Sequence, residues 1–88
     1  MVEQVKSFLD ADWSSLAKKY NDFSEYKQAV LRDEMSKCAD DAEWNLAEKD
    51  TDSESFPYFA MCLKNSVAMN TVLNQSQALR REVNGWHF

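Results

Sequence analysis

The sequence contains one glycine, Gly85, and one proline, Pro57, among 88 residues. Strands joined by tight turns depend on these two residue types, so their scarcity argues against a β protein. A single glycine also cannot build a phosphate-binding loop, which excludes nucleotide binding through a P-loop or a Rossmann turn. Long helices are therefore the expected elements.

Histidine is equally scarce, because His87 is the only one. Catalytic triads, Cys–His dyads and histidine-based zinc sites therefore lack their parts. The segment 50–54 resembles the start of a calcium loop, but Ser55 and Met61 stand where glycine and a bidentate glutamate are required. We expect no catalytic site, no metal and no cofactor, and hence a protein that is not an enzyme.

Long hydrophobic runs are missing as well. No stretch approaches the ~20 apolar residues of a membrane span, and the first residues show no basic leader followed by an apolar run. These features predict a cytoplasmic protein without a membrane partner. Cys38 and Cys62 stand among apolar neighbours at helical spacing, which favours buried free thiols over a disulfide in such a reducing compartment.

The charge is unbalanced, with fifteen acidic against ten basic residues and a net charge of −5. Residues 1–55 hold fourteen acids and seven bases, whereas residues 56–88 hold one acid and three bases. This charge opposes direct binding to nucleic acid or to an anionic membrane. The expected partner is a protein with a basic surface.

Hydrophobic spacing predicts three helices. Apolar residues recur at steps of three and four over residues 2–20, and Asp12 offers an alternative in which this helix breaks and restarts at Trp13. Asp22 and Glu25 form a capping-box pattern that opens a second helix. No glycine or proline interrupts this second helix up to about residue 48.

The third helix is expected to follow an exposed connection. Residues 49–55 contain no apolar residue and many turn-forming ones. Pro57 suits a first helical turn and Gly85 suits a C-terminal cap. We therefore predict one all-α domain over residues 1–88, a small bundle in which an N-terminal helix (about 2–20) packs across two long antiparallel helices (about 22–48 and 57–84).

Carboxylates recur along the second predicted helix. Glu34, Asp41 and Glu48 are seven residues apart, Asp33 and Asp40 flank them, and the heptad positions lie about 10 Å apart on a helix. Such a strip fits a basic site on a partner, as in a nucleic-acid mimic. The alternative is a solvated helix face that only keeps the protein soluble.

Trp44 lies off the apolar stripe of that helix, among acidic residues. Tryptophan in such surroundings is a common contact residue at binding surfaces, and packing against the N-terminal helix is the alternative. A bundle this small is not expected to bury all of its aromatic side chains, so some should meet another chain. The candidates are Trp13, Trp44, Phe56, Phe59, Trp86 and Phe88.

Between Lys64 and Arg80 the third predicted helix has no charged residue, yet it is rich in amides and hydroxyls. Interface cores are depleted of charge, so this stretch predicts a homo-oligomer interface. A polar but uncharged outer face is the alternative. The predicted interface residues are Asn65, Met69, Asn70, Leu73, Asn74 and Gln77.

Three functions fit these features. The leading hypothesis is a small acidic, non-enzymatic binder of the inhibitor, anti-defence or immunity type, which occupies a basic site on a partner protein. The second is a structural assembly or adaptor subunit that self-associates through the third helix. The third is an oligomer that sequesters a small ligand such as a nucleotide between protomers, through Asn70, Asn74 or Arg80.

Overall fold

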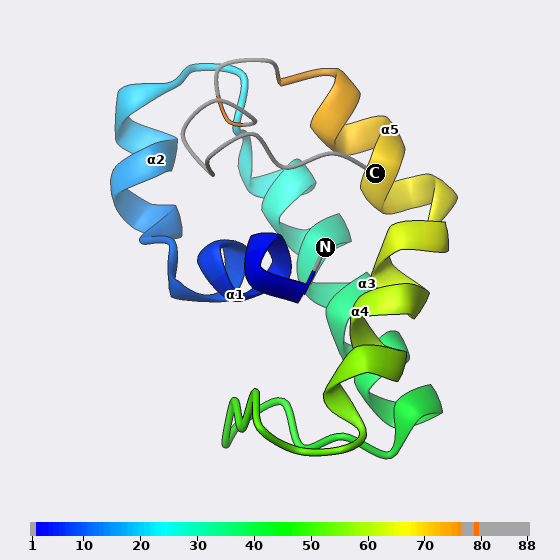
Figure 1. Ribbon diagram of the computed structural model, residues 1–88. Coiled ribbons are helices and arrows are strands. Elements are labelled where there is room, and N and C mark those ends of the chain that lie inside the picture. Colours follow the sequence, from blue (N-terminus) through cyan, green and yellow to red (C-terminus); the bar gives the residue numbers. More distant parts are fainter. Residues whose placement is uncertain (1, 77–78, 80–88) are drawn as a thin grey trace.

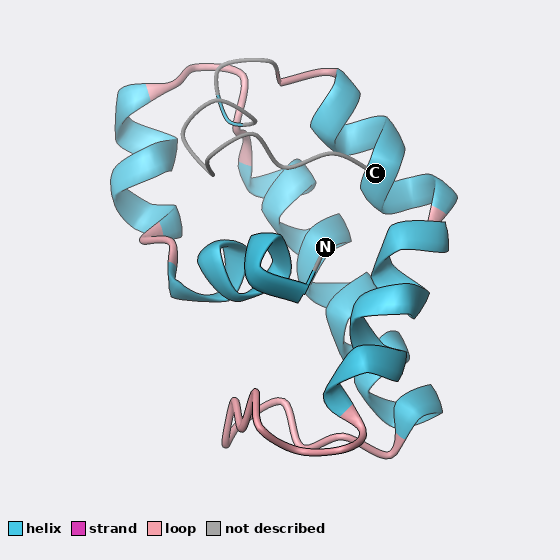
Figure 2. Cartoon of the chain, in the orientation of Figure 1, coloured by secondary structure: helices cyan, strands magenta, loops and turns pink. Residues whose placement is uncertain are grey.

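The computed structural model of the chain describes residues 2–76 and residue 79 (Figure 1). Within these residues the protein is 68% helical and contains no strand (Figure 2), which confirms the expected all-α class. Five helices pack together, and the arrangement of two long antiparallel helices is not confirmed. The helices are α1 (Val2–Asp10), α2 (Trp13–Lys19), α3 (Glu25–Ala42), α4 (Phe56–Asn65) and α5 (Val67–Asn74).

The predicted N-terminal helix is two helices, because Asp12 ends one pattern and caps the next. Its backbone is extended (φ −83°, ψ 94°), and its carboxylate accepts hydrogen bonds from the main-chain N–H groups of Ser14 and Ser15. These are two of the donors that a helix start leaves without a partner. The broken alternative is therefore the correct one, and α2 runs in a different direction from α1 (Figure 1).

Helix α3 is shorter at both ends than predicted. Ser24, and not the box of Asp22 with Glu25, caps its start, and the Asp22 carboxylate instead accepts a hydrogen bond from the Ser76 hydroxyl at 3.0 Å. The helix ends at Ala42 because Glu43 adopts a left-handed conformation (φ 55°). A residue in this conformation stops a helix and redirects the chain.

The third predicted helix is also broken. Pro57 lies in the first turn of α4 as predicted, but Ser66 has an extended backbone and separates α4 from α5. The Ser66 hydroxyl accepts a hydrogen bond from the Met69 N–H at 3.1 Å and so caps α5. Helix α5 ends at Asn74, and Gln75 and Ser76 are not helical, so the predicted helix does not continue there. The rest of the prediction, up to residue 84 with Gly85 as its cap, lies outside the described residues apart from Leu79.

One hydrophobic core joins the elements, since α4 and α5 both pack against α3 and α1 packs against α4. Phenylalanine, leucine and methionine supply most of its volume. The buried core residues are Val5, Phe8, Leu9, Leu16, Phe23, Leu31, Met35, Cys38, Ala39, Trp44, Phe56, Phe59, Ala60, Leu63, Met69, Val72, Leu73 and Leu79.

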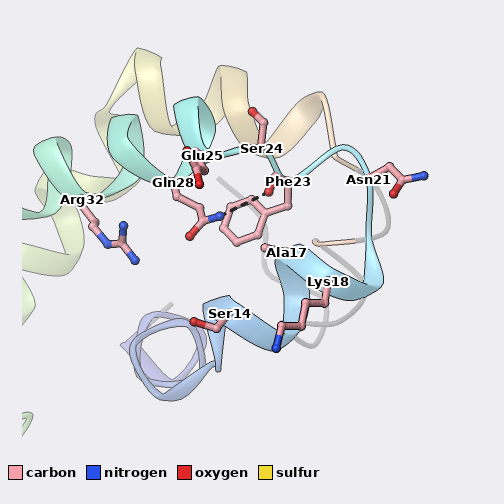
Figure 3. Close-up of a pocket in the computed structure, with 9 residues that line it drawn as sticks. All are labelled: Ser14, Ala17, Lys18, Asn21, Phe23, Ser24, Glu25, Gln28 and Arg32. Atoms are coloured by element: carbon pink, nitrogen blue, oxygen red, sulfur yellow. Dashed lines mark hydrogen bonds between the residues drawn. The ribbon is translucent and has the colours of Figure 1, made fainter.

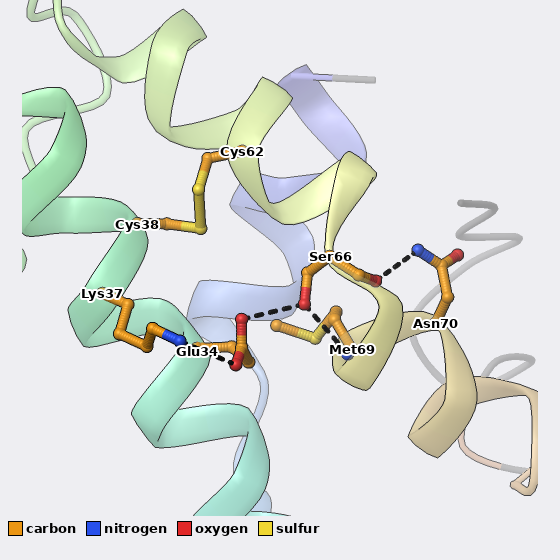
Figure 4. The surroundings of a disulfide bond; sticks show 7 residues. All are labelled: Glu34, Lys37, Cys38, Cys62, Ser66, Met69 and Asn70. Carbon is orange, nitrogen blue, oxygen red and sulfur yellow. Dashed lines mark hydrogen bonds and ion pairs between the residues drawn. A yellow bond between two sulfur atoms is a disulfide. The ribbon is translucent and has the colours of Figure 1, made fainter.

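Cys38 of α3 and Cys62 of α4 form a disulfide, so the prediction of free thiols is wrong (Figure 4). The apolar spacing that suggested buried thiols instead places both residues on the facing sides of two packed helices. Their Cα atoms are 5.6 Å apart, within the range that a disulfide spans. Disulfides are rare in reducing compartments, so this bond gives the predicted cytoplasmic location no support.

In the part of the chain that the structure describes, no helix combines the length and the apolar character that crossing a membrane requires.

Candidate functional site

Seven exposed carboxylates gather where α3 ends and the chain crosses to α4. Two belong to the last turn of α3 and five to the loop over residues 43–55, at the lower end of the molecule in Figure 1. Lys49 is the only basic residue in this segment. We call these seven residues the acidic end: Asp40, Asp41, Glu43, Glu48, Asp50, Asp52 and Glu54.

Trp44 connects the acidic end to the hydrophobic core. Its side chain is 5% exposed, and its ring lies 4.4 Å from the Phe59 ring and 5.2 Å from the Phe56 ring, measured between centroids. Its indole Nε1–H donates a hydrogen bond of 2.9 Å to the main-chain carbonyl oxygen of Asp50. The loop is therefore attached to the core near its middle.

This position corrects the expectation that Trp44 offers an exposed aromatic contact. The ring is packed in the core, with the phenylalanines of α4 as its aromatic neighbours, whereas the alternative placed it against the N-terminal helix. The left-handed turn at Glu43 makes this possible, because the Trp44 N–H then donates to the Ala39 carbonyl oxygen at 2.9 Å and the side chain turns inward. Phe56 and Phe59 are buried too, and Trp13 is half-buried, so the core holds more aromatic surface than expected.

Side chains within the loop fix its turns. The Asn45 side-chain oxygen accepts hydrogen bonds from the N–H groups of Ala47 and Glu48 at 3.0 and 3.3 Å. The Asp50 carboxylate does the same for the N–H of Asp52 at 3.1 Å. Asparagine and aspartate stabilise turns in this way. The loop is thus a folded segment, whereas the sequence predicts only an exposed connection over residues 49–55.

The predicted heptad strip of carboxylates is not continuous. Glu48 lies beyond the end of α3, so it does not continue the helical repeat. Glu34 is only 21% exposed, and its carboxylate accepts a hydrogen bond from Ser66 at 2.9 Å and lies 3.9 Å from the Lys37 ammonium (Figure 4). Of the predicted contacts on α3, Asp40 and Asp41 remain exposed at the helix end.

The predicted oligomer interface is divided between the core and the surface. Met69 and Leu73 are buried inside the chain, whereas Asn65 and Asn74 are exposed. Gln77 lies outside the described residues. The predicted set therefore does not form one exposed face.

The Asn70 side chain explains part of the uncharged composition. Its amide Nδ2 donates to the carbonyl oxygen of Lys64 at 3.0 Å and, as Figure 4 shows, to that of Ser66 at 2.7 Å. Lys64 belongs to the last turn of α4, where carbonyl groups lack helical partners. The Ser66 carbonyl also accepts a hydrogen bond from the Asn70 N–H at the start of α5. The amides and hydroxyls of this stretch thus serve the break between α4 and α5, and a ligand-binding role for Asn70 would compete with that use.

Among the residues of the ranges 2–76 and 79, no three His, Cys, Asp or Glu side chains converge in a way that could hold a metal ion. A comparison of the chain with protein-family models, with curated proteins and with solved structures found no match.

Proposed function

We propose that the protein binds a basic surface of a partner protein through the acidic end and acts by occupying that surface, without catalysis, as an inhibitor or immunity-type protein does. One observation carries the proposal: seven exposed carboxylates and one lysine occupy a segment that Trp44 holds to the core. Arginine on the partner is the preferred match, because its guanidinium group pairs with a carboxylate through two parallel hydrogen bonds.

The fixed conformation of the loop favours affinity. A disordered acidic segment must lose conformational freedom when it binds, which subtracts from the free energy of association. A loop that is already folded avoids most of this cost. Its concentrated negative charge also accelerates encounter with a basic partner and makes the association rate depend on salt.

Two triple variants with the same net charge test the proposal. The loop variant D50N/D52N/E54Q neutralises the acidic end, and the control D10N/E25Q/D33N neutralises three exposed carboxylates elsewhere. A protein captured from lysate by the wild-type chain should bind the control about as tightly and the loop variant at least tenfold more weakly, since hydrogen bonds to charged groups contribute about 1.5–3 kcal/mol each. Equal binding by both variants contradicts the proposal.

Self-association is the second candidate function, favoured by exposed apolar side chains on the outer side of α4 and α5. Tyr58 is 72%, Met61 48% and Val67 80% exposed. Tyr58, Met61 and Asn65 are spaced three and four residues apart and so share one helix face. Sedimentation of wild type and of M61K distinguishes this candidate, because an apolar interface persists at high salt and is lost in the variant.

A further inference from the structure

A groove of about 700 Å³ lies between α2 and the first half of α3, on the side of the molecule away from the acidic end (Figures 1 and 3). Its volume is in the range of sites that bind small molecules. Its lining is polar for such a site: Ser14 and Lys18 come from α2, and Glu25, Gln28 and Arg32 come from α3.

Arg32 is held in place by an aromatic ring. Its guanidinium carbon lies 5.2 Å from the centroid of the Trp13 ring, a cation–π arrangement. Trp13 in turn packs at 5.1 Å against Phe8 and at 6.0 Å against Phe23, both of which are buried. The guanidinium group therefore has a defined position before any ligand arrives.

Arg32 also has no acidic partner within the described part of the chain, although the sequence holds fifteen acids. The residues one helical turn away, Gln28 and Ser36, are uncharged. A carboxylate at either position would be close enough to pair with the guanidinium group. Its N–H donors are thus available to an anion outside the chain.

The rest of the groove suits an oxyanion that carries hydroxyl groups. Lys18 supplies a second positive charge from the α2 wall, against the single carboxylate of Glu25. Gln28 uses its Nε2 on the Phe23 carbonyl oxygen at 3.5 Å, which leaves its side-chain oxygen as an acceptor. Figure 3 shows the side chains of α2 and α3 on the two sides of the gap.

An adjoining groove of about 310 Å³ shares Ser14 and Arg32 with the first groove and is also lined by Lys49 and Asp12. Arg32 therefore lies where the two grooves meet. Because the Asp12 carboxylate opposes the charge of Lys49, the positive charge for an anion at that point comes mainly from Arg32 and Lys18.

We propose that the groove between α2 and α3 binds a small hydroxylated organic anion, a carboxylate or a phosphate monoester, whose charged group pairs with the guanidinium of Arg32. Lys18 contributes long-range attraction, and Ser14 and Gln28 hydrogen-bond the hydroxyl groups. None of these four residues belongs to the acidic end, so the proposal does not depend on the function proposed above.

Titration of the ¹⁵N-labelled full chain tests the site, with citrate as the carboxylate probe, glucose 6-phosphate as the phosphate probe and glucose as the neutral match. We expect one or both anions at millimolar concentration to shift the amide signals of Ser14 and Gln28 and the Nε signal of Arg32. Glucose should leave these signals unchanged. A response to one anion alone assigns the charged group, and a response to neither overturns the proposal.

Variants separate recognition from general charge attraction. R32Q should weaken binding of the responding anion at least about tenfold, because a charge-assisted hydrogen bond is lost. R32K keeps the charge and the fold but lacks the planar guanidinium group, so its affinity should lie between those of wild type and R32Q. K64Q removes an exposed charge on α4 and should bind as wild type. If R32Q and R32K both bind as tightly as wild type, Arg32 is not the recognition residue and the proposal fails.

Discussion

The indole nitrogen of Trp44 and the carbonyl oxygen of Asp50 lie 2.9 Å apart, and this hydrogen bond ties the acidic end to the hydrophobic core. Trp44 leaves α3 through the left-handed turn at Glu43 and packs beneath the loop against Phe56 and Phe59. The turn at Glu43 ends the helix, and the Trp44 side chain fills the core and ties the loop that carries the carboxylates to it.

Replacing Trp44 should loosen the loop in two graded steps. W44F keeps most of the packing and removes the N–H donor, so it should lower the free energy of unfolding by about 1 kcal/mol or somewhat more. W44A also leaves a cavity and should cost about 3–5 kcal/mol. Urea denaturation measures both values.

The control for this pair is W13F, which removes an indole N–H that is directed at the Phe8 carbonyl oxygen and not at the loop. The amide signals of residues 45–54 should shift more in W44F than in W13F. Equal shifts of the loop amide signals in W44F and W13F would show that Trp44 does not attach the acidic end to the core.

The disulfide should account for a large share of the stability. Cys38 and Cys62 are 24 residues apart, and closing a loop of this length stabilises the folded chain by about 3–4 kcal/mol in the chain-entropy model. Protein purified without reductant should contain no titratable thiol and should melt at a lower temperature once reduced. The variant C38S/C62S should show no response to reductant. Quantitative thiol labelling of the folded, unreduced protein would contradict the structure.

Asp12 should make the stability of the N-terminal half depend on acid pH. The Ser15 hydroxyl, which donates a hydrogen bond of 2.8 Å, and then the Ser15 and Ser14 N–H groups lower the pKa of Asp12 below its ordinary value of 3.8. A carboxyl group whose pKa is lowered by folding stabilises the folded state above pH 3.8, and this contribution disappears as the pH falls through the lowered pKa.

The variant D12N tests this effect, because asparagine can still cap α2 but does not titrate in this range. Its melting temperature should fall less steeply in acid than that of wild type. Identical acid profiles for D12N and wild type would show that the Asp12 carboxylate has the same pKa in the folded and unfolded chain.

Ser66 is only partly buried, yet its replacement should lower the free energy of unfolding. Its hydroxyl accepts from the Met69 N–H and donates to the Glu34 carboxylate, so S66A removes a helix cap and a link between α5 and α3. We expect a loss of about 1–2 kcal/mol in the free energy of unfolding, measured in urea. S36A, on an exposed position of α3, is the matched control and should change stability by less than about 0.5 kcal/mol. Equal stability of the two variants would contradict the role of Ser66.

The helix breaks show what the sequence pattern conveys and what it omits. Apolar residues recur with the same spacing on both sides of Asp12 and of Ser66, so periodicity alone predicts continuous helices there. Each break depends on a single side chain that caps the next helix, a difference of about 1 kcal/mol that tertiary packing decides. The sequence does offer the break at Asp12 as an alternative, because aspartate before an apolar residue is a known signal for the start of a helix.

The acidic end shows a different limit. Its charge and an exposed connection over residues 49–55 follow from the sequence, whereas the end of α3 at Ala42 and the support by Trp44 do not. A non-glycine residue in the left-handed conformation is disfavoured, so nothing local predicts that α3 ends at Glu43. Burial of the Trp44 ring against α4 offsets this cost, and that contact joins segments that only the folded chain brings together. The prediction of free thiols failed for a related reason. It relied on the rarity of disulfides in reducing compartments, and residue spacing does not reveal that Cys38 and Cys62 face each other across α3 and α4.

Backbone ¹⁵N relaxation of the loop over residues 43–55 tests the central claim, that Trp44 holds the carboxylates of the acidic end in one arrangement. The account predicts order parameters of about 0.85 across the loop, equal to those of α3. Values below about 0.6 between Asn45 and Glu54 would contradict it, because carboxylates on a mobile segment have no fixed pattern to match a partner.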